Sequence, residues 1–219
     1  ADGFVDGATA LGCAQTSTFA FTLDGTGRVL LTYRQTSTNR QVVARLDARG
    51  RPDASYGATG FVVLPGIEAM NFPTLAATAD GALLVTGKAS DSTESRLRVF
   101  KLSSAGALDA SFGAAGVQAI SESDVEVSSE GHVALQPDGG FVIAWTSIDR
   151  RTPAAPYSVS HLERRLASGA LDATFGTLGR ASLPERAEAE AIVNQGLRTI
   201  VVLRDHSVRN APHRLYAFD

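Results

Sequence analysis

Several features that define common classes of protein are missing from the sequence. The 219 residues include a single cysteine, Cys13, so no disulfide bond can form within the chain. No apolar run approaches the roughly 18 residues that a membrane-spanning helix requires, so we expect no membrane span. The formal net charge is −3, which lacks the positive excess typical of nucleic-acid binding. The composition therefore argues against a disulfide-stabilised scaffold, a transmembrane protein and a nucleic-acid-binding protein.

Sequence signatures of common catalytic and cofactor sites are also absent. The chain contains no Gly-x-Ser-x-Gly turn, no His-Glu-x-x-His motif, no phosphate-binding loop and no calcium-binding loop. Ser160 and His161 are neighbours in a predicted strand, where adjacent side chains point to opposite faces, so these two cannot form a catalytic pair. We predict no catalytic residue, and a non-enzymatic role is the better expectation.

What the sequence does contain is an internal repeat of an eleven-residue motif. The three copies are GALDASFGAAG at 106–116, GALDATFGTLG at 169–179 and GRPDASYGATG at 50–60. A second marker, a turn before an apolar run, recurs with spacings of 56, 58 and 57 residues at Gly25, Gly81, Gly139 and Gly196. The chain is therefore built from four similar units.

Each unit has the pattern of four short β-strands. In the second unit an apolar stretch precedes the Asp80-Gly81 turn, and ALLVTG, RLRVFKL and VQAI follow it in order. Asp-Gly between apolar runs is a strong hairpin signal, because glycine tolerates the positive φ of tight turns. The strands are largely apolar on both faces, as in sheets packed between two others, and no stretch has a helical period. Four-stranded units with a period of roughly 55–60 residues predict an all-β propeller of four blades.

The eleven-residue motif is expected to have a structural role. Its aspartate and the serine or threonine two residues later can hydrogen-bond the backbone of their own turn. The aromatic residues Tyr56, Phe112 and Phe175 can pack beneath the edges of the sheets. Phosphate binding is disfavoured because no helix follows the glycines of the motif.

The motif Leu-Asp-x-Ser-Phe-Gly-x-x-Gly, followed about thirty residues later by an Asp-Gly turn, resembles the delta-60 repeat of bacterial β-propeller proteins. The best matches are 108–116 and 171–179, whereas Pro52 and Tyr56 depart from the pattern and the fourth unit lacks the motif. The resemblance covers essentially the whole chain. It implies a propeller and a secreted, periplasmic or cell-surface location, and it transfers no catalytic residue.

The two ends of the chain predict how the ring closes. The C-terminal HRLYAFD aligns with third strands, and the N-terminal DGFVDG aligns with the start of a fourth strand. We therefore expect residues 3–8 to form the outer strand of the last blade beside 213–218, which closes a four-bladed ring in one chain. A monomer is the expectation, and two chains that exchange these strands to close an eight-bladed ring are the alternative. The absence of methionine before Ala1 fits a processed mature protein or an expressed segment.

The predicted propeller is one domain over residues 1–219. Its units lie at roughly 9–65, 66–120, 121–183 and 184–219, the last completed by residues 1–8.

The loops that follow the second and fourth strands differ from unit to unit, whereas the turns after the first and third strands are short and repetitive. Function usually lies on divergent loops held by a rigid scaffold, so these loops form the candidate binding face. Acidic residues gather in the loops that lead into the innermost strands, and basic residues gather after the second strands. This pattern would favour a cation or an amine, and a merely solvated surface is the plainer interpretation. The candidate ligand-binding residues are Glu68, Asn71, Asp124, Glu126, Arg150, Tyr157, Glu188, His206 and Arg209.

Two histidines fall at what the alignment gives as one position of the third strand. His161 and His213 stand where Gln41 and Leu97 stand in the other units. Two imidazoles at matched heights could share a metal ion, but no third ligand of fixed spacing is visible. Leu97 at the same position indicates packing between blades, so we predict no metal site.

Two functional hypotheses from different classes remain. The favoured one is a non-catalytic binding or interaction module that recognises a protein, a glycan or a small ligand through the divergent loops. The alternative is a hydrolase or lyase that uses carboxylates at the channel mouth, such as Glu126 and Glu188, with or without a metal ion. A purely structural repeat is a third possibility. The ligand and any cofactor stay unknown at the level of sequence.

Overall fold

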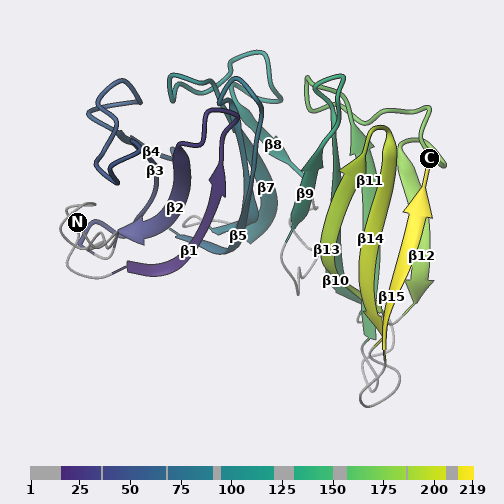
Figure 1. The fold of residues 1–219 in the computed structure, drawn as a ribbon. Coiled ribbons are helices and arrows are strands. Elements are labelled where there is room, and N and C mark those ends of the chain that lie inside the picture. The colour runs from purple at the N-terminus through teal and green to yellow at the C-terminus, as the bar shows by residue number, and fades with distance from the viewer. Residues whose placement is uncertain are drawn as a thin grey trace.

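The computed structural model describes residues 16–35, 37–67, 69–90, 95–120, 131–149, 157–185, 187–205 and 212–219. These residues form fifteen β-strands and no helix (Figure 1), so the all-β prediction is confirmed.

The strands form four antiparallel sheets in chain order. Sheet 1 contains β1 (Thr16–Leu23), β2 (Val29–Gln35), β3 (Arg40–Leu46) and β4 (Phe61–Val63). Sheet 2 contains β5 (Ala69–Ala77), β6 (Leu83–Ser90), β7 (Ser95–Leu102) and β8 (Val117–Ala119). Sheet 3 contains β9 (His132–Leu135), β10 (Phe141–Asp149), β11 (Tyr157–Arg165) and β12 (Arg180–Glu185). Sheet 4 contains β13 (Ala187–Gln195), β14 (Arg198–Asp205) and β15 (His213–Phe218).

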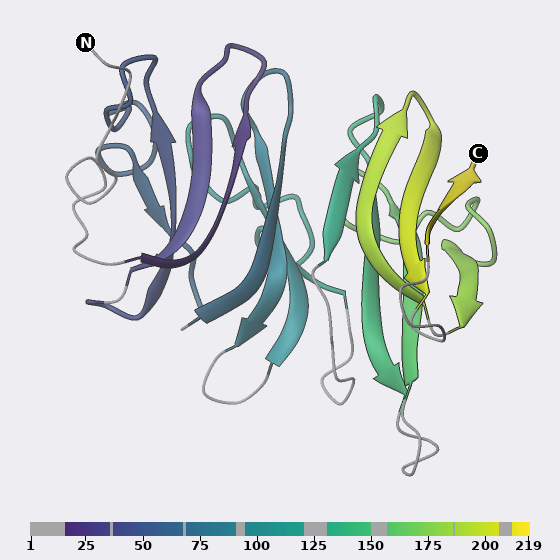
Figure 2. The same ribbon diagram turned by 60° about the horizontal axis from the view of Figure 1, so that its bottom comes forward.

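The sheets follow one another as the blades of a propeller. The first strand of each sheet is innermost: β1 lies against β5, β5 against β9, and β9 against β13. Figure 2 shows the same succession from a second direction. The propeller prediction is therefore confirmed.

A glycine with positive φ closes the turn after the first strand of each sheet. In sheets 1, 2 and 3 these residues are Gly27, Gly81 and Gly139, with φ of 80°, 87° and 83°. In the first unit Gly27, and not the Gly25 of the sequence alignment, therefore occupies the left-handed position that favours glycine. In sheet 4 the turn is tighter, and Gly196 has φ of 64°.

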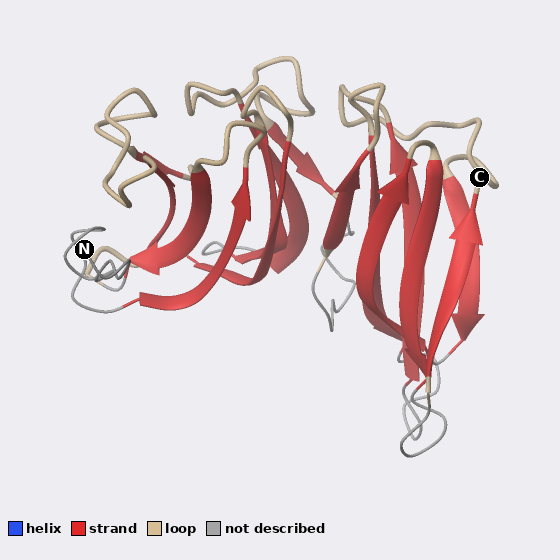
Figure 3. Cartoon of the chain, in the orientation of Figure 1, coloured by secondary structure: helices blue, strands red, loops and turns tan. Residues whose placement is uncertain are grey.

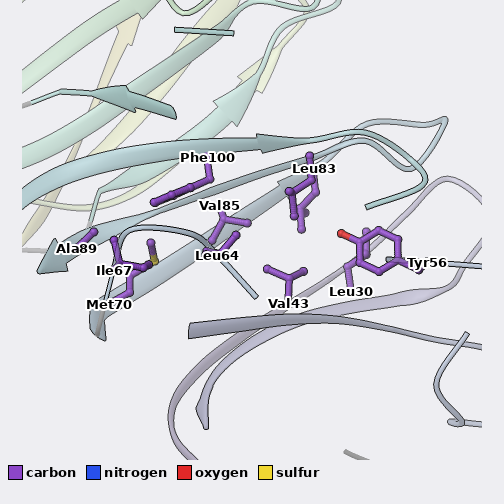
Figure 4. Close-up of a cluster of buried hydrophobic side chains, with 11 residues drawn as sticks. Leu30, Val43, Tyr56, Leu64, Ile67, Met70, Leu83, Val85, Ala89 and Phe100 are labelled. Atoms are coloured by element: carbon purple, nitrogen blue, oxygen red, sulfur yellow. The ribbon is translucent and has the colours of Figure 1, made fainter. Parts of the chain in front are cut away.

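Sheets 2 and 3 each contribute residues to two different cores, one on either face. We call the face of a sheet that points toward the preceding sheet its leading face, and the opposite face its trailing face. Leu30 and Val43 on the trailing face of sheet 1 pack against Leu83, Val85 and Phe100 on the leading face of sheet 2 (Figure 4).

The same arrangement repeats at the next two interfaces. Leu84 of sheet 2 packs in one cluster with Phe141 of sheet 3, and Val142 of sheet 3 packs in another with Val201 and Leu203 of sheet 4. Phe141 and Val142 are neighbours that point to opposite faces, and both are buried. The strands of sheets 2 and 3 are apolar on both faces because both faces are covered.

The closing strand predicted at residues 3–8 lies outside the described residues, so the closure stays a prediction. Within the described part of the chain, β15 pairs with β14 alone. There, β13 and β1 do not pack together as the successive innermost strands do. Sheets 1 and 4 lie at the two ends of the row of blades (Figures 1 and 2).

Candidate functional site

The two ends of the blades differ in their loops. At the motif end, the segments 47–60, 103–116 and 166–179 join third strands to fourth strands. At the divergent end, the loops follow second and fourth strands, and most of their residues lie outside the described part of the chain. Figure 3 shows the motif end as tan loops at the top of the view.

Each aspartate of the eleven-residue motif has both carboxylate oxygens engaged. Oδ1 of Asp109 accepts bonds from the backbone N (3.0 Å) and the hydroxyl (2.6 Å) of Ser111, and Oδ2 lies 3.1 Å from Nζ of Lys101. The hydroxyl bond is the main reason why the pKa of Asp109 lies below its usual value. Asp53 has the same partners in Ser55 and Arg45, and Asp172 has them in Thr174 and Arg164.

The basic partner of each aspartate also lies over the aromatic ring of the motif. The cation-to-centroid distances are 4.7 Å for Arg45 over Tyr56, 5.7 Å for Lys101 over Phe112 and 4.9 Å for Arg164 over Phe175. All three rings are buried, as the sequence predicted. The cation itself was missed, although a signal existed, because a basic residue stands eight positions before each motif aspartate.

The motif also ties neighbouring sheets together. The backbone N of Gly57 donates to the carbonyl of Ala105 in the next unit, and the N of Gly113 donates to the carbonyl of Ser168, both at 2.8 Å. Nζ of Lys101 donates to the carbonyl of Ala167 at 3.2 Å. The motif therefore holds the blades together, which supports the structural interpretation and directs the search for a ligand site to the divergent end.

Few of the predicted ligand-binding residues fall within the described part of the chain. Outside it lie Glu68, Asp124, Glu126, Arg150, His206 and Arg209. Tyr157 begins β11, Asn71 is an exposed residue of β5, and Glu188 is a half-buried residue of β13. These three residues belong to three different sheets, so whether the nine residues form one site stays a prediction.

The predicted separation of acidic and basic residues fails at Glu190 of sheet 4. Oε1 of Glu190 lies 3.7 Å from Nη1 of Arg204, and its Oε2 lies 2.6 Å from Nε2 of His213. In the sequence, Glu190 belongs to the acidic residues that lead into the innermost strands, and Arg204 belongs to the basic residues that follow the second strands. The strands bring the two together because β13 pairs directly with β14, so at this point the charges compensate each other.

A polar cluster that sequence reasoning missed lies on the leading face of sheet 3. The ring of His161 stacks on Trp145, with centroids 3.9 Å apart and 14° between the planes. Nε2 of His161 is 2.8 Å from the hydroxyl of Ser147. Burial holds the pKa of His161 below its usual value, because it disfavours the charged ring. Register was the missing information, because Trp145 and His161 are sixteen residues apart in the chain and directly opposite in the sheet.

The proposed equivalence of His161 and His213 is wrong. His161 pairs with Trp145 and lies on the leading face of sheet 3. His213 is two residues from Leu215, which pairs with Val202 on the trailing face of sheet 4. The two imidazoles therefore point away from each other, and they cannot share a metal ion. Among the described residues, no three His, Cys, Asp or Glu side chains gather as metal ligands would.

The fold defines the class of protein, a β-propeller, and the comparisons agree. A family model described as a domain of unknown function (DUF5122) β-propeller matches residues 78–112, in keeping with a delta-60-like repeat. This segment runs from the turn before β6 to the motif. No curated protein matches the sequence. No helix of the described residues has the length and apolar character needed to cross a membrane.

Two solved structures are similar over most of the chain. An α-L-arabinanase of Penicillium chrysogenum, solved with arabinobiose, has a TM-score of 0.52 and 11% identity over 92% of this chain. The polysaccharide lyase Uly1 has a TM-score of 0.50 and 12% identity over 94% of this chain. The chain spans 62% and 50% of those two structures. At such low identity the likeness establishes the propeller fold alone.

Proposed function

We propose that the chain is a binding module that recognises a glycan through the loops of its divergent end. The observation that carries the proposal is the difference between the two ends. At the motif end, the aspartates, basic residues and aromatic rings of the three motifs are already bound to one another and to the neighbouring blade. A ligand would have to displace these contacts, whereas the loops at the divergent end vary freely between units.

The choice of a glycan rests on fold-level similarity and on the kind of residue available. The two structures described above, with TM-scores of 0.52 and 0.50, carry the names of polysaccharide-degrading enzymes. The candidate residues Asn71, Arg150, Tyr157 and Glu188 supply amide, guanidinium, phenol and carboxylate groups, which suit sugar hydroxyls and ring faces. A location outside the cytoplasm is part of the same proposal.

A hydrolase or lyase is the second candidate. Glu188 lies on β13, an innermost strand, directly opposite Arg204 on β14. A half-buried carboxylate beside the axis could act as an acid or a base if a second carboxylate such as Glu126 lay nearby. This hypothesis differs from the first in requiring turnover.

The test is affinity electrophoresis of the purified chain in gels that contain arabinan, a neutral galactan or an acidic polysaccharide. We expect retardation by at least one polymer, and we expect Tyr157→Ala and Glu188→Gln to weaken it roughly tenfold. Thr177→Ala is the matched control, because Thr177 is exposed at the motif end. Retardation by no polymer, or equal loss in the control, would contradict glycan recognition at the divergent end.

Incubation with the same polymers separates the two candidates. New reducing ends without an unsaturated product indicate a hydrolase, and new reducing ends together with a conjugated double bond indicate a lyase. If either signal is present and is lost in Glu188→Gln or Glu126→Gln, the catalytic candidate replaces the binding module. Retardation without products supports the binding module.

A further inference from the structure

The two outermost faces of the row of blades expose apolar residues at positions that are buried between blades. In register, Leu215 of sheet 4 corresponds to Val99 of sheet 2 and Leu162 of sheet 3. Val99 and Leu162 are buried, whereas Leu215 is 73% exposed. Val193, on the same trailing face, is also exposed. The trailing face of sheet 4 thus exposes apolar residues at positions that are buried between blades, beside the charged pairs of Glu190 with Arg204 and His213.

The leading face of sheet 1 is partly covered and partly open: Tyr33, Val42 and Ala44 are buried there, whereas apolar residues of β1 on the same face are exposed. Phe21 and Leu23 of β1 are 69% and 59% exposed. By register they correspond to Leu75 and Ala77 of β5 and to Val133 and Leu135 of β9. Those four residues pack in the interfaces between sheets 1 and 2 and between sheets 2 and 3.

End faces of repeat proteins are normally polar, because apolar end faces bind further repeats or aggregate. In this chain one end face is the trailing face of sheet 4, and the other end face is the leading face of sheet 1. Within the chain, every trailing face that meets a sheet meets a leading face. A trailing face of one copy is therefore suited to the leading face of another.

We propose that two copies of this chain associate head to tail, with sheet 4 of each copy packed on sheet 1 of the other, to form an eight-bladed ring. The contact is heterologous and is made twice, so a twofold axis closes the ring and leaves no apolar end face exposed. The inference is independent of the glycan hypothesis.

The mass of the intact chain in solution, measured by light scattering after size exclusion, is the first test. The expected value is twice 22.9 kDa. Leu215→Lys places a charge in the contact, and we expect it to shift the mass to that of one chain at the same concentration. Leu178→Lys is the matched control, because Leu178 is 72% exposed at the motif end, and it should leave the dimer intact.

A mixing experiment tests the head-to-tail geometry. Leu23→Lys should also give single chains, because it places a charge on the leading face of sheet 1. The two variants are mixed in equal amounts. A heterodimer of Leu215→Lys with Leu23→Lys has one junction in which both charges meet and one junction with two unaltered faces. We expect native mass spectrometry to detect a heterodimer in the mixture and mostly single chains in each variant alone.

The outcomes decide the proposal. A single-chain mass for the intact protein overturns it and assigns the end faces to another occupant, such as further blades of a longer polypeptide or closure within one chain. A dimer that survives both substitutions, or a mixture that yields no heterodimer, overturns the geometry. Circular dichroism of each variant shows whether loss of the dimer reflects loss of folding, and the two variants lie in different sheets, so one unfolded variant leaves the other informative.

Discussion

The Trp145 indole covers the His161 imidazole face to face, with ring centroids 3.9 Å apart. The contact joins β10 to β11 on the face of sheet 3 that packs on sheet 2. Because burial there disfavours the charged ring, the pKa of His161 in the folded protein lies below 6.5. The nearby Glu163 opposes this shift and Arg180 adds to it.

This arrangement predicts a pH dependence of stability. The unfolded chain binds a proton on His161 near pH 6.5, whereas the folded chain does so only at lower pH. The free energy of unfolding should therefore fall as the pH drops below about 6.5 and be fully present above it. Urea unfolding from about pH 7.5 to about pH 5.5 measures the dependence. His161→Gln cannot take up the proton and should have a smaller slope, so identical slopes would contradict the assignment.

The ion pair between Arg45 and Asp53 predicts a large effect of Arg45→Met. Arg45 is nearly buried, its Nε lies 2.9 Å from Asp53, and its Nη1 also donates to the carbonyl of Ser104 in the next unit. Loss of the cation leaves the partly buried carboxylate of Asp53 with only the more distant Arg28, at 3.7 Å, as an ionic partner. We expect this loss to lower the free energy of unfolding by about 3 kcal/mol. Arg51→Met is the control, because its pair with Asp47 is exposed and should contribute less than about 1 kcal/mol.

The burial of Phe112 predicts how much an aromatic ring of the motif contributes to the free energy of unfolding. The ring is fully buried, 5.9 Å from Phe141 of sheet 3 and 5.7 Å from Nζ of Lys101. We expect Phe112→Ala to cost about 3–5 kcal/mol in denaturant unfolding, because the cavity lies between two sheets. Leu178→Ala removes an exposed side chain and should change the value by less than about 0.5 kcal/mol. A cost below about 1 kcal/mol for Phe112→Ala would contradict the role assigned to the motif.

Alanine substitutions at two glycines with positive φ distinguish the cost of backbone strain from the cost of a steric clash. Gly113 has φ of +52°, and a Cβ there would lie 2.3 Å from the carbonyl oxygen of Val117. Gly27 has φ of +80°, and a Cβ there would meet nothing within 4 Å. We expect Gly27→Ala to cost about 1 kcal/mol from backbone strain alone, and Gly113→Ala to cost roughly 3 kcal/mol or more. Equal costs in thermal unfolding would mean that the backbone at Gly113 relaxes freely.

Removal of residues 1–8 tests the predicted closing strand. If residues 3–8 pair with β15, within one chain or between two, their deletion exposes the edge of that strand and should lower the melting temperature or cause aggregation. Thermal unfolding of the intact and shortened chains makes the comparison. A change of only a degree or two would show that these residues are a loose tail.

The sequence by itself determined the number of units and their strand pattern. A fixed spacing of glycine turns and a motif repeated three times are local signals, and local hydrogen bonding and turn chemistry are enough to interpret them. The burial of Tyr56, Phe112 and Phe175 followed from the same local reasoning. The candidate site could be predicted only as a set of divergent loops, because loops follow no period.

Tertiary structure decided everything that depends on register or on contact between blades. A shift of one residue moves a side chain to the other face of a strand, which is why His161 and His213 look equivalent in the sequence and lie on opposite faces. The pairing of β13 with β14 brought Glu190 to Arg204. The exposure of Leu215 depends on which sheet comes next, and a repeat pattern, which is the same in every unit, carries no information about where the row of blades ends.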